Sequence, residues 1–62
     1  MQLLKPADVA AILSVSESAL EAWRAQGKGP PWHRIEGRIR YDEERVREYV
    51  REREAGGDGS RP

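Results

Sequence analysis

The sequence predicts a mainly α-helical domain with a small β-hairpin, in the order helix-turn-helix-hairpin-helix. Apolar residues recur at helical spacing over 6–13 and 17–26, and a short polar break separates these two segments. Residues 32–35 and 38–41 read as strands joined by a two-residue turn. A final amphipathic helix is expected over 42–54. Two short helices followed by a hairpin and a third helix form a winged helix-turn-helix.

The first helix is predicted from its start and from its apolar side. Pro6 suits the first helical position, where its missing N–H is one that a helix leaves unpaired. Asp8 lies in the first turn, where the helix dipole favours an acid. Val9, Ile12 and Leu13 recur at i, i+3 and i+4, so we expect them to face the core together.

The second helix has a clear start and a clear end. Ser16 is a good N-cap, because its hydroxyl can accept an N–H from the following turn. Leu20 and Trp23 repeat at i, i+3 and form its apolar side. Gly27 ends it, as glycine often does just past a helix C-terminus. Val15, between two serines, is expected to be buried between the helices.

The hairpin register follows from its turn. With Glu36-Gly37 as a two-residue turn, Ile35 faces Arg38 and Trp32 faces Tyr41. Directly opposed residues share a face of the sheet. The face expected to meet the core consists of Trp32, Arg34, Ile39 and Tyr41. The face expected to meet solvent or a ligand consists of His33, Ile35, Arg38 and Arg40.

The end of the chain divides into a helix and a tail. Asp42 is placed to cap the last helix, and Val46 and Val50 give that helix a narrow apolar stripe. We expect one domain over 1–54 and a flexible, glycine-rich tail over 55–62. The remaining core is expected from large apolar and aromatic side chains, since the chain has no phenylalanine. These are Leu3, Leu4, Trp23, Trp32, Tyr41 and Tyr49.

Composition excludes several classes of function. The 62 residues include no cysteine and a single histidine, His33, so we expect no disulfide, no metal site and no cofactor. A chain this short can hardly enclose a pocket, so we expect no small-molecule substrate and no enzymatic activity. It has no signal region and no apolar run near the roughly 20 residues of a membrane span. We therefore expect a cytoplasmic protein with no membrane association.

The charge is zero in total but unevenly distributed. The chain has 11 basic and 11 acidic residues. Residues 30–41 hold three arginines and one acid, whereas residues 42–54 hold four arginines and six acids. The hairpin is therefore cationic and the last helix acidic. A cationic hairpin after a helix-turn-helix indicates binding to double-stranded DNA.

This order of elements resembles the excisionase-type, MerR-like winged-helix family of small bacterial and phage DNA-binding proteins. The resemblance covers about residues 3–52. It is carried by Leu3-Leu4 before Pro6, Val9–Leu13, Val15-Ser16, Leu20 with Trp23-Arg24, Gly29–Pro31, Arg34–Tyr41 and Val46 with Tyr49-Val50.

The resemblance implies a recombination directionality factor of a phage or integrated element. Such proteins bind repeated sites near an attachment site beside neighbouring copies, bend the DNA and direct an integrase toward excision. Many relatives are small transcription regulators or DNA-packaging subunits instead. A third possibility is a protein-interaction adaptor with little DNA affinity of its own.

The candidate DNA contacts lie on the second helix, the following loop and the hairpin. Arg38 and Arg40 are the strongest candidates, because a wing arginine fits the negative potential of a narrow minor groove. Arg24 is expected to reach a phosphate, or to pair with Glu21 or with an acid of the last helix. The full set is Ser16, Glu17, Ser18, Glu21, Arg24, Lys28, His33, Arg34, Arg38 and Arg40. Family members often have basic or aromatic residues where this chain has Glu17, Glu21 and Ala22.

Overall fold

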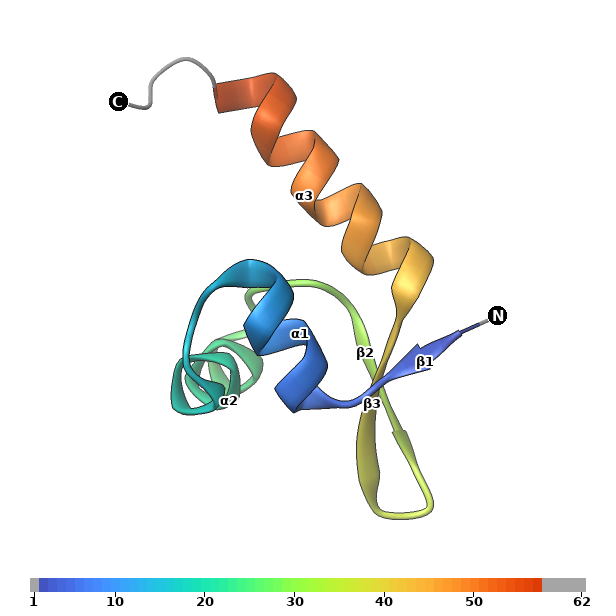
Figure 1. Cartoon of the computed structure of the whole chain (residues 1–62). Coiled ribbons are helices and arrows are strands. Elements are labelled where there is room, and N and C mark those ends of the chain that lie inside the picture. The colour runs from blue at the N-terminus through green and yellow to red at the C-terminus, as the bar shows by residue number, and fades with distance from the viewer. Residues whose placement is uncertain (1, 58–62) are drawn as a thin grey trace.

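The computed structural model describes residues 2–57 and contains three helices and a small antiparallel sheet (Figure 1). Helices α1 and α2 pack against each other, and α1 and α3 each pack against strand β3. In Figure 1, α3 runs away from the sheet, and the β2–β3 turn points away from all three helices. The elements are β1 (Leu3–Leu4), α1 (Pro6–Leu13), α2 (Glu17–Gln26), β2 (Trp32–Ile35), β3 (Arg38–Asp42) and α3 (Glu43–Gly57).

The sheet has three strands in the order β1-β3-β2, one more than the sequence predicted. The predicted hairpin register is confirmed in all four pairs: Trp32↔Tyr41, His33↔Arg40, Arg34↔Ile39 and Ile35↔Arg38. The unpredicted strand β1 pairs Leu3 with Asp42 and Leu4 with Tyr41. Two residues are too few to show the period-2 alternation that identifies a strand in sequence.

The hairpin turn has positive φ at both central residues. Glu36 has a φ of 52° and Gly37 a φ of 79°, the combination that a type I′ turn requires. This turn matches the twist of the flanking strands and sets the register. Glycine adopts positive φ without strain, but an L-residue such as glutamate pays roughly 1–2 kcal/mol.

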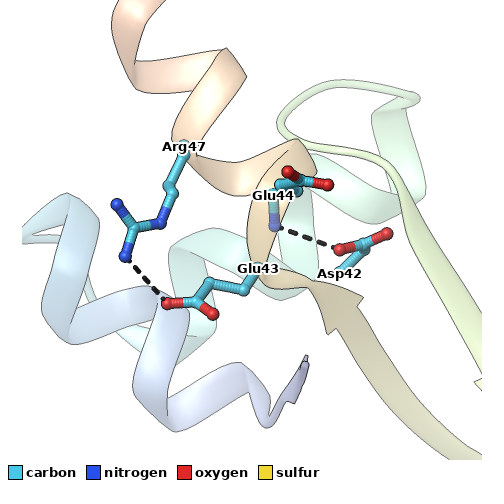
Figure 2. A network of polar contacts seen from close by, with 4 residues as sticks. All are labelled: Asp42, Glu43, Glu44 and Arg47. Atoms are coloured by element: carbon cyan, nitrogen blue, oxygen red, sulfur yellow. Dashed lines mark hydrogen bonds and ion pairs between the residues drawn. The ribbon is translucent and has the colours of Figure 1, made fainter. Parts of the chain in front are cut away.

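Side-chain caps begin α2 and α3 as predicted. The Ser16 Oγ accepts a hydrogen bond from the Ala19 N–H at 3.0 Å. Asp42 Oδ1 accepts one from the Glu44 N–H, also at 3.0 Å (Figure 2). In the same view Arg47 and Glu43 form an exposed ion pair at 3.2 Å. The caps supply partners for backbone donors that a helix start leaves unpaired.

Helix α1 has a different arrangement at each end. Lys5 occupies the cap position, and its backbone N–H donates to the Asp8 carboxylate at 3.1 Å. At the other end Ser14 adopts the left-handed conformation with a φ of 58°. The Val15 N–H donates to the Ala10 carbonyl at 2.9 Å, which closes the turn between α1 and α2.

A small apolar cluster lies between the helices and the sheet. Its buried members are Val9, Ala10, Leu20, Tyr41 and Val46, and Leu4, Leu13, Val15, Trp23, Trp32 and Ile39 pack around them. Most of the predicted core is confirmed, with some corrections. Leu3, predicted in the core, is 40% exposed in β1, and Ile12 is 53% exposed. Tyr49 is half-buried, with the Arg53 guanidinium carbon 3.8 Å from its ring centroid.

Helix α3 is longer than the sequence indicated. It continues to Gly57, past the domain boundary predicted after residue 54. Residues 58–62 of the predicted tail lie outside the described residues, so the division into domain and tail stays a prediction. None of the described helices is long and apolar enough to span a bilayer.

Candidate nucleic-acid interface

The exposed side of α2 carries acidic and small polar side chains. Glu17, Ser18 and Glu21 are all exposed, while Leu20 of the same helix is fully buried. Ser16 is exposed too, and its hydroxyl oxygen is occupied in the cap while its own proton remains available to donate. This side of α2 can accept hydrogen bonds from base amino groups but offers no cation to a phosphate.

Arg24 is the basic residue of α2, and it points toward the sheet. Its Nη1 donates to the Tyr41 hydroxyl at 3.0 Å in a partly buried contact. Its guanidinium carbon also lies 6.0 Å from the centroid of the Trp32 ring. Tyr41 takes the place of the acidic partners considered from the sequence. Contact between Arg24 and a phosphate stays a prediction, and the guanidinium keeps further N–H donors for it.

The wing of this fold is the β2–β3 hairpin, and it presents basic residues on both of its faces. Arg34 was expected on the core face, but it is exposed, with its guanidinium carbon 5.9 Å from the Trp32 centroid. Its long side chain lets the charged group reach solvent although the residue starts on the core face. His33 and Arg38 are exposed as predicted for the outer face.

The guanidinium group of Arg40 is less accessible to DNA than the sequence suggested. The residue is half-buried, and its Nη1 donates to the backbone carbonyl of Ile39 at 2.7 Å. It lies opposite His33 in the sheet, so the two share the outer face of the hairpin. Of the two strongest candidates, Arg38 is therefore the more accessible cation and lies next to the turn.

The connector after α2 holds Lys28 close to the helix end. Gly27 has a φ of 73°, and the Lys28 N–H donates to the Trp23 carbonyl at 2.8 Å. Gly29 has a φ of 85°, and a Cβ placed on it would lie 3.0 Å from Cε3 of Trp23. The Lys28 backbone is thus held in place, and its exposed side chain starts from a defined position.

The sequence did not indicate that two aromatic residues would contact the candidate arginines. Trp32 and Tyr41 were expected only to fill the core. Tyr41 also accepts a hydrogen bond from Arg24, and the guanidinium groups of Arg24 and Arg34 both lie near the Trp32 ring. The signal available was the hairpin register, which places Trp32 directly opposite Tyr41. Nothing in the sequence indicated that Arg24 of α2 would meet this pair.

Metal ligation is not supported by the geometry. Within residues 2–57, no cluster of three or more His, Cys, Asp or Glu side chains is arranged to hold an ion.

Comparison with known proteins identifies a family. A family model described as a helix-turn-helix domain matches residues 3–54, which includes every candidate contact. No curated protein and no solved structure matches the chain. The matched family is common among excisionase-like and MerR-like DNA-binding proteins, and such domains are typically non-enzymatic. The chain belongs to this helix-turn-helix domain family, and its helix-turn-helix implies that it binds DNA.

Proposed function

We propose that the domain binds duplex DNA with α2 toward the major groove and the β2–β3 wing along the neighbouring backbone and minor groove. The observation that carries this proposal is the position of the cations. Arg24 lies where α2 meets the sheet, and Arg34 and Arg38 lie exposed on the wing. Phosphate contacts of this kind supply affinity and orientation, whereas base contacts supply selectivity.

The acidic side of α2 supports selectivity more than affinity. Glu17 and Glu21 repel phosphates, but a carboxylate can accept a hydrogen bond from the amino group of cytosine. Ser18 can hydrogen-bond to several bases. We therefore infer weak binding by a single copy, with a preference for sites that place cytosine against these acids.

We further propose that the protein is an excisionase, an architectural factor that acts with an integrase. Weak binding by one copy fits a protein that works as several copies on repeated sites. The charge distribution supports this arrangement, because the wing is cationic and α3 is rich in acids, including the exposed Glu44, Glu48 and Glu52. The wing of one copy and α3 of the next then attract each other along the DNA.

A second candidate is an adaptor that binds a protein in place of DNA. The acidic exposed side of α2 favours it, because a DNA reader normally presents this face to the major groove, where the nearby phosphates repel acids. A small transcription regulator would share the proposed DNA contacts and differ only in the sites that it binds.

Footprinting on the attachment region of the element that encodes the protein separates these functions. An excisionase is expected to protect several adjacent sites, phased by about one helical turn, with sigmoidal dependence on protein concentration. An excision assay with the cognate integrase should then depend on the protein. Protection of one promoter site alone supports the regulator, and no protection of any duplex at low salt supports the adaptor.

A further inference from the structure

Two arginines from different elements approach one aromatic ring. The guanidinium carbon of Arg24 on α2 lies 6.0 Å from the Trp32 centroid, and that of Arg34 on β2 lies 5.9 Å from it. Both distances are at the outer limit of a cation–π contact. Both guanidinium groups therefore lie near the same indole ring.

The two arginines are held to different degrees. Arg24 is fixed by the hydrogen bond from its Nη1 to the hydroxyl of Tyr41, a residue only 1% exposed. Tyr41 is itself held directly opposite Trp32 in the hairpin. Arg34 is exposed and adjustable. The two positive charges repel each other, and an anion that contacts both guanidinium groups is attracted to each of them.

We propose that Arg24 and Arg34 together bind one backbone phosphate of duplex DNA, with Trp32 and Tyr41 as the residues that position them. This inference rests on the proposed DNA binding and adds its anchoring point, the junction of α2 and the wing. A phosphate matches the pair because its oxygens can accept parallel hydrogen bonds from guanidinium groups. One shared phosphate fixes α2 and the wing in the same register on the duplex.

The test uses the full chain and a duplex of about 20 base pairs selected from a random library for binding at low salt. Each phosphate of that duplex is replaced in turn by a neutral methylphosphonate. Replacing the shared phosphate is expected to weaken wild-type binding about tenfold. Arg24→Gln and Arg34→Gln should each weaken binding to the unmodified duplex, and both should lose sensitivity at that same linkage.

Arg38→Gln is the matched control. Arg38 is an exposed arginine of the same hairpin, next to the turn and on the opposite face from Trp32. Its loss should weaken binding while leaving the sensitivity at the shared linkage intact. This control separates loss of one particular phosphate contact from a general loss of positive charge.

The positioning role of Trp32 is tested by a pair of variants. Trp32→Phe keeps an aromatic face and is expected to retain affinity within about threefold, whereas Trp32→Leu should lose about tenfold. Far-UV circular dichroism monitors the fold of both. If both variants are folded and bind DNA with equal affinity, the positioning role of Trp32 is refuted. The methylphosphonate replacements with Arg24→Gln and Arg34→Gln decide whether one phosphate is shared, even if Trp32→Leu unfolds.

The possible results are distinguishable. If Arg24→Gln and Arg34→Gln lose sensitivity to methylphosphonate at two different linkages, the arginines bind separate phosphates. This inference is then overturned, while the proposed DNA binding stands. If selection recovers no duplex, the proposed DNA binding fails and the inference falls with it. Loss of sensitivity at one common linkage in both variants supports the proposed DNA binding and the shared phosphate.

Discussion

Replacing Glu36 in the hairpin turn should stabilise the domain. Glu36 has a φ of 52°, a conformation that costs an ordinary L-residue roughly 1–2 kcal/mol. Asparagine is the preferred residue at this position of a type I′ turn before glycine, and Gly37 already follows. Glu36→Asn should therefore recover part of that cost, about 0.5–1 kcal/mol. For a domain of this size, such a gain raises the Tm by about 2–8 °C.

Thermal and urea unfolding, followed by far-UV circular dichroism, measure this effect. Glu36→Gln is the matched control, because it removes the same negative charge but keeps a side chain that is strained at positive φ. We expect Glu36→Asn to raise the Tm and Glu36→Gln to leave it nearly unchanged. Both variants remove an acid from the cationic wing, so both should bind duplex DNA somewhat more tightly than the wild type.

Equal stabilisation by Asn and Gln would refute the reasoning, since the gain would then come from charge and not from backbone conformation. A lower Tm for Glu36→Asn would show that the glutamate side chain makes a favourable contact in this turn. The m-value from urea unfolding should stay the same in all three proteins, because the change affects one exposed turn.

Three further substitutions test the packing and the caps. Leu20→Ala removes a fully buried side chain and should cost about 2–5 kcal/mol, a large part of the stability of so small a domain. Urea unfolding measures the loss, and an unchanged free energy of unfolding would contradict the core assignment. Gly29→Ala places a Cβ 3.0 Å from Trp23 Cε3 at a φ of 85° and should cost about 1–2 kcal/mol with altered tryptophan fluorescence, whereas an unchanged Tm would show that the connector yields freely. Ser16→Ala should lose about 1 kcal/mol in urea unfolding and Ser16→Asp should retain the cap, so equal losses would exclude a capping role.

Local signals predicted most of the fold. Ser16 and Gly27 mark both ends of α2 because capping and left-handed glycine depend on neighbouring residues alone. The two-residue turn determined the hairpin register for the same reason, since turn length fixes which residues face each other.

Features that depend on distant parts of the chain were not predictable. Strand β1 exists because Leu3 and Leu4 meet β3, and two residues carry no pattern of their own. Ile12 fits the helical stripe of α1, yet it is 53% exposed because it lies at an open groove beside Val46 and Val50 of α3. The bond from Arg24 to Tyr41 joins residues 17 positions apart on different elements, and only the packed fold brings them together.

Strand β1 has a consequence for the order in which the chain folds. Leu3 pairs with Asp42, and the Gln2 carbonyl accepts a hydrogen bond from the Glu43 N–H at 2.9 Å. This pairing closes a loop that contains α1, α2 and most of the hairpin, and its entropic cost exceeds that of any local turn. We therefore expect β1 to pair with β3 after the β2–β3 hairpin has formed. We expect hydrogen exchange during refolding to protect the helices and the β2–β3 hairpin before the β1 amides.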